Sequence, residues 1–161
     1  MFAVRCSMNS RILIAYFSAS GVTAKAAEEI AAAVGGDLYE IVPAQRYTAA
    51  DLDWTDKHSR STAEMSDAAC RPQIAGALPD LSGYDVVFVG FPVWWYVEPR
   101  IVDTFLESCD FSGKTIIPFA TSGGSGISGA EKNMKSLCPS AKFVRGKLVN
   151  AGAGAWAKTV V

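Results

Sequence analysis

The chain has 161 residues, half of them hydrophobic, and this size and composition predict one globular domain with a substantial core. Its 15 basic and 16 acidic residues give a net charge of −1, which excludes the basic surface typical of nucleic-acid-binding proteins. No apolar run reaches the length of a membrane span, and residues 1–10 are too short and too weakly apolar for a secretory signal. We therefore expect a tail over residues 1–10, with Met8 as an alternative start, followed by a domain over residues 11–161.

The first predicted strand runs directly into a helix. Residues 12–17 are continuously apolar, and residues 24–34 have apolar side chains at the spacing of one helix face. A helix start presents unpaired N–H groups and the positive end of the helix dipole, which together favour a phosphate. The same composition is also typical of an ordinary cap in which Ser20 or Thr23 begins the helix. The connecting residues, all candidates for phosphate binding, are Ser18, Ala19, Ser20, Gly21, Val22 and Thr23.

The middle of the chain is less regular. Residues 37–42 predict a short strand, residues 44–55 a long connection, residues 56–69 a polar and partly helical segment, and residues 73–84 a loop. The clearest strand follows over residues 85–91, where continuous apolar residues indicate burial on both faces. It ends in an aromatic loop with Pro92, Val93, Trp94, Trp95 and Tyr96. Three successive large aromatics cannot all point inward, so we expect at least one to be exposed, although core packing is the alternative role for the others.

The second half repeats the pattern. A helix starts near Pro99, a strand follows over residues 115–120, and a helix over residues 127–137 leads to a last strand over residues 141–149. Pro118 cannot donate to a strand ladder, so we expect it near a strand end or a local irregularity. The tail, residues 150–161, is long enough for one or two helical turns. A loop of hydroxyls and glycines leaves the fourth strand: Thr121, Ser122, Gly123, Gly124, Ser125 and Gly126.

The alternation of strand and helix, repeated about five times, predicts an α/β fold: a doubly wound parallel sheet with helices on both faces. Ligands of such folds bind beyond the carboxyl ends of the strands. The serine-rich, aromatic and glycine-rich loops must all reach that edge. Together they suit a planar, phosphorylated aromatic ligand, with an indole of Trp94 or Trp95 beside its ring.

Other binding and catalytic motifs are absent from the sequence or incomplete. Residues 124–129 match GxGxxG, but a dinucleotide site needs an acidic residue about 20 positions later, and no Asp or Glu occurs from Cys138 onward. Walker A and GxSxG motifs are absent, and His58 is the sole candidate for a Ser–His triad. A phosphoacceptor domain needs aspartates where Ser18 and Phe91 stand. Four scattered cysteines without CxxC spacing predict free thiols in a reducing compartment, the cytoplasm, and no metal site.

The three loops resemble those of the flavodoxin superfamily, in particular short flavodoxin-like bacterial proteins with FSxSGxT, PxWW and TSGGSG motifs, which stand here at residues 17–23, 92–95 and 121–126. The resemblance implies a five-stranded sheet in the order 2-1-3-4-5 and non-covalent FMN. The first loop would hold the phosphate, residues 92–95 would line one side of the isoalloxazine, and residues 121–126 the other side. No insertion splits the last strand, which indicates a short-chain type.

The implied function is electron transfer through FMN, with a protein redox partner. The alternative is an NAD(P)H-dependent reductase of quinones or similar small acceptors. The nearly neutral charge favours this alternative, because carriers that dock large partners are typically strongly acidic. Neither function needs a catalytic side chain, since the cofactor carries the redox chemistry. The protein is expected to be a monomer or homodimer.

Overall fold

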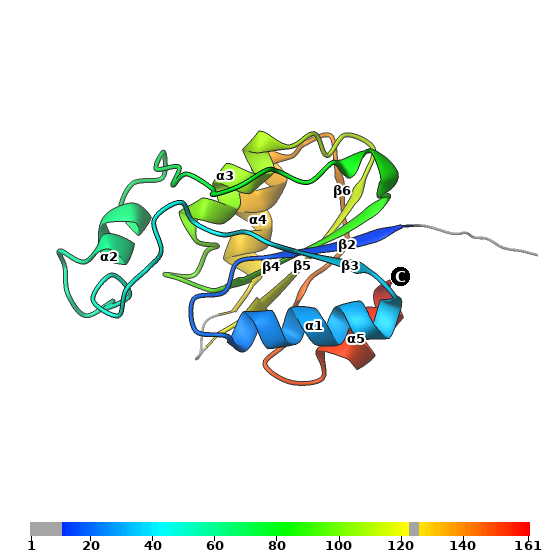
Figure 1. Ribbon diagram of the computed structural model, residues 1–161, viewed down its shortest axis with the longest axis horizontal. Helices are drawn as coiled ribbons and strands as arrows, with labels where there is room; N and C mark the ends of the chain where they lie inside the picture. Colours follow the sequence, from blue (N-terminus) through cyan, green and yellow to red (C-terminus); the bar gives the residue numbers. More distant parts are fainter. Residues whose placement is uncertain (1–10, 123–125) are drawn as a thin grey trace, which may run out of the picture.

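Strands and helices alternate along the chain in the computed structural model, which describes residues 11–122 and 126–161 (Figure 1). The elements are β2 (Ile12–Tyr16), α1 (Val22–Val34), β3 (Asp37–Glu40), α2 (Arg60–Met65), the 3₁₀ turn η1 (Leu81–Gly83), β4 (Val86–Pro92), α3 (Arg100–Ser108), β5 (Thr115–Thr121), α4 (Ser128–Leu137), β6 (Lys142–Phe143), β7 (Lys147–Leu148) and α5 (Ala153–Val160).

The sheet has the order β3-β2-β4-β5-β6, and β7 also pairs with β5. Every pairing between these strands is parallel. Counted as five strand positions in chain order, this is the predicted 2-1-3-4-5 arrangement, which is confirmed. Because all strands run the same way, the segments that follow β2, β4 and β5 leave the sheet at one edge.

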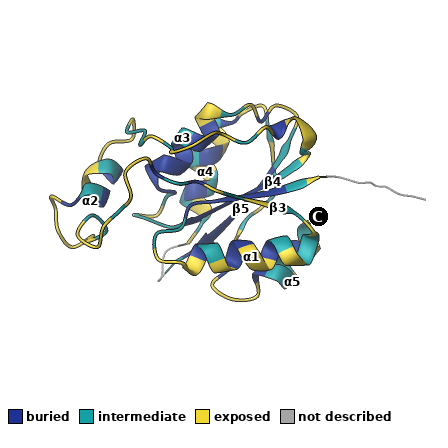
Figure 2. Cartoon of the chain, viewed as in Figure 1, coloured by how far each residue is buried: buried dark blue, intermediate teal, exposed yellow. Residues whose placement is uncertain are grey.

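Each central strand is buried on both faces, as its continuous apolar sequence predicts (Figure 2). Successive side chains alternate between two cores: Leu13 of β2 belongs to the core under α3 and α4, whereas Ile14 belongs to the core under α1 and α5. Figure 1 shows these two helix pairs on opposite faces of the sheet. The tail forms α5, in which Ala153 and Ala157 are fully buried, and Trp156 packs edge-on against Phe88.

The prediction of one continuous last strand over residues 141–149 is wrong. The strand is broken into β6 and β7, both of which pair with β5. The break lies opposite Pro118, which has no N–H and sits within β5. Gly146 approaches so closely that a Cβ there would lie 2.3 Å from the Pro118 carbonyl oxygen, and its N–H bonds instead to the Glu131 carboxylate at 2.6 Å. Pro118 therefore marks an irregularity, as predicted.

Smaller differences concern element ends. Helix α1 begins at Val22, two residues before the predicted start, and β3 ends at Glu40 although Ile41 N–H still bonds to the Tyr16 carbonyl at 2.7 Å. The segment between β3 and β4 extends away from the sheet and carries α2 (Figure 1). Within the described part of the chain, none of the helices is both long enough and apolar enough to cross a membrane.

Candidate functional site

A cavity of about 330 Å³ lies at the edge where β2, β4 and β5 end. This volume falls in the ~300–1,000 Å³ range of small-molecule sites. The loops that follow all three strands contribute to it, so the predicted convergence of these loops is what the structure shows. The lining residues are Ser20, Val22, Pro92, Val93, Trp94, Thr121, Ser122 and Asn150.

The first loop shapes the start of α1. Gly21 precedes the helix with φ of 94°, a left-handed conformation that glycine adopts without strain. Ser18 Oγ accepts from the N–H groups of Gly21 at 3.1 Å and Ala24 at 3.2 Å. A helix start leaves four N–H groups without intrahelical partners. Among the described residues, those of Val22 and Thr23 remain for a ligand, beside the exposed Ser20.

The Thr23 side chain turns inward rather than toward the cavity. It is 2% exposed, and its hydroxyl is 2.8 Å from that of Thr121, which is itself buried. This bond joins the start of α1 to the end of β5. Ala19 is likewise partly buried and packs on the core under α3 and α4. The two side chains therefore fix the frame of the site, and the Thr23 contribution left for a ligand is its N–H group.

The aromatic loop forms a tight turn. Trp94 N–H bonds to the Val97 carbonyl at 2.9 Å, and Val97 N–H bonds back to the Trp94 carbonyl at 3.1 Å. The two residues between them, Trp95 and Tyr96, have positive φ of 48° and 69°. Such conformations are those of a two-residue hairpin turn, and they cost bulky residues roughly 1–2 kcal/mol each. Trp95 is 42% and Tyr96 is 70% exposed, which confirms that part of the aromatic run faces solvent.

Trp94 serves the core and the cavity together. Its indole packs edge-on against Phe17 at 5.7 Å and against Tyr47 at 5.5 Å between ring centroids. Tyr47 comes from the long segment before α2, where its hydroxyl bonds to the Glu64 carboxylate and the Arg60 guanidinium lies 3.8 Å from its ring centroid. Burial, and this bond to a carboxylate, raise the pKa of the Tyr47 phenol far above its ordinary value. The phenol therefore stays neutral and braces the Trp94 side of the cavity.

The third loop is held at Ser122, the residue directly after β5. Asn150, two residues after the end of β7, accepts from Ser122 N–H through Oδ1 at 3.0 Å and donates from Nδ2 to the Ser122 carbonyl at 2.7 Å. Gly126 is exposed and does not line the cavity. Predicted site residues Gly123, Gly124 and Ser125 lie outside the described residues.

A buried pair of carboxyl groups lies behind the aromatic turn. Glu98 and Asp103 are 0% and 1% exposed, and Asn133 of α4 donates to Glu98 Oε2 at 2.6 Å. Among the described residues, Glu98 Oε1 and both Asp103 oxygens have no hydrogen-bond donor, although Arg100 and Arg71 lie 3.5 and 3.9 Å from Asp103 Oδ2. Burial and the adjacent Asp103 raise the pKa of Glu98 to about 9, so Glu98 carries a proton at neutral pH. Burial also raises the pKa of Asp103.

Seven of the predicted site residues line the cavity in the structure: Ser20, Val22, Pro92, Val93, Trp94, Thr121 and Ser122. Of the rest, Ser18, Ala19, Gly21 and Thr23 shape the loop from behind, and Trp95 is exposed outside the lining. The sequence prediction missed Asn150 and Tyr47. The position of Asn150 at the carboxyl end of a strand was a usable signal for the first, whereas no local pattern distinguishes Tyr47.

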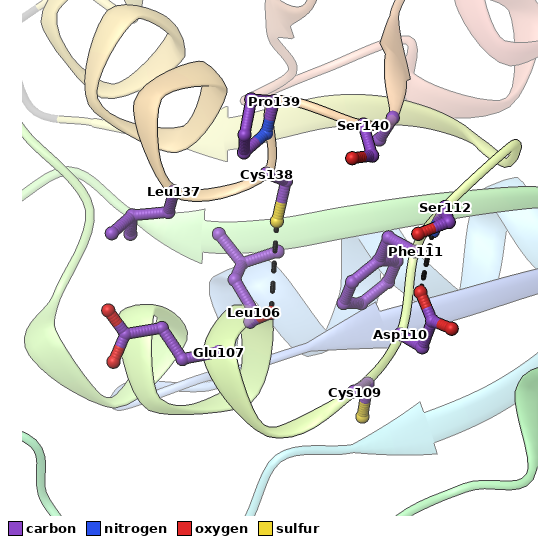
Figure 3. Close-up of a pocket in the computed structure, with 11 residues that line it drawn as sticks. Leu106, Glu107, Cys109, Asp110, Phe111, Ser112, Leu137, Cys138, Pro139 and Ser140 are labelled. Carbon is purple, nitrogen blue, oxygen red and sulfur yellow. Dashed lines mark hydrogen bonds between the residues drawn. The ribbon is translucent and has the colours of Figure 1, made fainter.

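A second cavity of about 270 Å³ lies between the C-terminal ends of α3 and α4 (Figure 3). Cys138 Sγ donates to the Leu106 carbonyl at 3.7 Å, and the Cys109 side chain points away from this contact (Figure 3). Burial raises the pKa of both thiols to about 11, so they are protonated and poor nucleophiles or metal ligands. Together with Cys70 they are free cysteines, and the described residues contain no cluster suited to a metal.

Comparisons with known proteins agree with this architecture. Crystal structures of putative flavoproteins from Bacteroides eggerthii and Bacteroides uniformis are 50% and 51% identical in sequence, with TM-scores of 0.90 and 0.89. Each alignment covers 94% of this chain, and 95% and 97% of theirs. A flavoprotein from Lactobacillus acidophilus, crystallised in complex with FMN, shares the fold at 22% identity, with a TM-score of 0.71 over 86% of this chain and 92% of that one. No curated protein sequence matches the chain. The family model described as flavodoxin matches residues 11–159, and the chain therefore belongs to the flavodoxin family.

Proposed function

We propose that the protein binds FMN without covalent attachment and transfers electrons through it. The observation that carries the proposal is the shared cavity, in which a helix start, an indole and a hydroxyl-bearing loop line one hollow at the carboxyl edge of the sheet. The helix start suits a phosphate, and the indole suits a flat ring. The hydroxyl-bearing loop suits the polar atoms at the rim of that ring.

The donor set suits the phosphate end of FMN. The N–H groups of Val22 and Thr23 point from the start of α1, where the helix dipole favours an anion, and Ser20 adds a hydroxyl. Their chemistry fits a phosphate without a basic side chain. Trp94 offers an indole already fixed by Phe17 and Tyr47, so little side-chain entropy is lost when a ring binds beside it.

FMN supplies one- and two-electron redox chemistry when bound, and the chain supplies binding and electrostatics. Among the described residues that line the cavity there is no ionisable side chain, so their polar contacts come from amide and hydroxyl groups. Such groups hold their charge state across the physiological pH range.

The relatives support the same assignment. The two Bacteroides proteins are named flavoproteins at about half identity, and the Lactobacillus flavoprotein was crystallised with FMN. The free cysteines suit a reducing compartment, which fits a cytoplasmic protein.

Titration with FMN tests the proposal. Apo-protein added to FMN is expected to quench flavin fluorescence and shift its near-ultraviolet and blue bands, with one site per chain. S20A removes one hydroxyl from the phosphate end and is expected to weaken FMN binding severalfold while leaving riboflavin affinity unchanged. A wild-type protein that leaves the FMN spectrum and fluorescence unaltered would refute the proposal.

A second candidate function is an NAD(P)H-dependent reductase of quinones or similar small acceptors. The net charge of −1 favours it, because a protein without a strong acidic field gains little electrostatic steering towards a large basic partner. Rapid mixing of the FMN-loaded protein with NADPH under anaerobic conditions separates the two. Direct bleaching of the flavin supports the reductase. Persistence of the oxidised spectrum until a reductase protein is added supports the carrier.

A further inference from the structure

The Asn150 side chain lies where the backbone pairing between β5 and β7 ends. β7 pairs with β5 through Lys147–Phe119 and Leu148–Ala120, and Val149 N–H then bonds to the Ala120 carbonyl at 2.7 Å. The next position along the ladder is Ser122, one residue past the end of β5. At that rung the main chain after β7 turns away toward α5, through Gly152 with φ of 72°.

The Asn150 carboxamide fills the missing rung. Its Oδ1 accepts from the Ser122 N–H and its Nδ2 donates to the Ser122 carbonyl. A carboxamide carries the same donor and acceptor pair as a peptide group, so it continues the ladder by one residue. Ser122 is a described residue of the glycine-rich loop, and both it and Asn150 line the cavity.

The opposite side of the same strand end is anchored separately. Thr121 is tied to Thr23 at the start of α1 by the buried hydroxyl pair, 2.8 Å apart. One bond therefore sets the distance of β5 from the phosphate end, and the Asn150 pair holds the Ser122 backbone just past the end of β5. An aspartate at position 150 keeps the acceptor for Ser122 N–H but loses the donor to its carbonyl.

We propose that Asn150 is a positioning residue of the cofactor site: its carboxamide clamps the Ser122 backbone and thereby sets where the end of β5 meets the ring of the bound flavin. This inference rests on the proposed FMN function. It assigns to a residue just after the last strand a role in binding the ring, distinct from the phosphate binding at the start of α1.

The test compares N150A, N150D and N150S with Q73A, which removes an exposed carboxamide elsewhere on the chain. FMN and riboflavin are titrated separately into each apo-protein by fluorescence quenching, and the midpoint potential of each FMN complex is measured. Loss of the paired bonds is expected to weaken FMN and riboflavin by the same factor, about tenfold in N150A. N150D should bind with intermediate affinity and have a more negative midpoint potential, because it adds a negative charge beside the ring. Q73A should match the wild type.

Only variants with wild-type far-ultraviolet circular dichroism and cooperative unfolding are compared, and N150S and N150D serve if N150A does not fold. Wild-type FMN affinity and potential in the folded position-150 variants would overturn the role of Asn150 while leaving FMN binding intact. A loss confined to FMN, with riboflavin unaffected, would also overturn it, because the effect would then lie at the phosphate. If the wild-type protein binds neither compound, the proposed function and this inference both fail.

Discussion

Replacing Gly129 by alanine tests how the aromatic turn is held. Gly129 is the second residue of α4, and a Cβ there would lie 2.5 Å from the Tyr96 carbonyl oxygen. That is about 1 Å short of an ordinary contact distance. The neighbouring atom is backbone of a turn closed by two hydrogen bonds, so it cannot swing aside as a flexible side chain would.

Two opposing effects decide the outcome. Overpacking typically costs about 1–3 kcal/mol, and replacing glycine by alanine in a helix returns up to about 1 kcal/mol. We therefore expect G129A to lower the free energy of unfolding by about 1–2 kcal/mol, which for a chain of this size lowers the Tm by roughly 2–8 °C. Urea unfolding monitored by circular dichroism measures the first quantity. Tryptophan emission should change as well, because the displaced turn carries Trp95.

Gly154 provides the matched control, since it is the second residue of α5. A Cβ there would lie 3.2 Å from the Glu29 carbonyl oxygen and 3.3 Å from the Ala33 Cβ, contacts that small shifts relieve. G154A is expected to stay within about 0.5 kcal/mol of wild type, because the helix preference of alanine offsets the tighter contact. Equal stability and equal tryptophan emission of G129A and G154A would refute the claim that the turn rests against α4.

Three further predictions concern polar side chains. The pKa of Glu98 is raised from 4.5 to about 9 in the folded protein, so the folded state holds a proton that the unfolded chain releases, and the free energy of unfolding should fall as pH rises between those values. E98Q should flatten that slope in urea unfolding at pH 5 to 9, and an unchanged slope would contradict a proton held on buried Glu98. T23V leaves the Thr121 hydroxyl buried without its partner and should lower the free energy of unfolding by about 1–3 kcal/mol. In a double-mutant cycle, T23V/T121V should lower it by less than the sum of the two single variants, whereas strict additivity would contradict the bond. S18A removes the acceptor for two N–H groups at the start of α1 and should lower the free energy of unfolding, measured by thermal unfolding, by about 1 kcal/mol. No loss of stability would show that water replaces the Ser18 hydroxyl.

Much of the fold follows from local sequence. The continuous apolar runs of β2, β4 and β5 indicate strands covered on both faces, and the helices between them follow from apolar spacing. The sequence also identifies the three loops of the site, because the carboxyl ends of parallel strands share one edge. Element ends were predicted less well: Gly21 begins α1 through its left-handed conformation, and neither Ser20 nor Thr23 caps the helix.

What the sequence does not reveal depends on contacts between distant segments. The break between β6 and β7 arises because Pro118 on β5 faces Gly146, 28 positions apart in the chain. Tyr47 braces Trp94 only because the segment before α2 folds back over the aromatic loop. Glu98 reads as an ordinary polar residue before a helix, and only the packing of α3 against α4 buries it beside Asp103.

The interrupted strand at the far edge of the sheet also bears on behaviour at high concentration. An exposed, unbroken edge offers a row of free backbone groups on which a second molecule can template a strand. Here β6 and β7 contribute only two residues each, the chain bends away between them, and Lys142, Arg145 and Lys147 stand exposed along this margin. Positive charge and a missing rung both oppose edge-to-edge joining, so the proline that interrupts the ladder also makes this edge a poor template for a second strand.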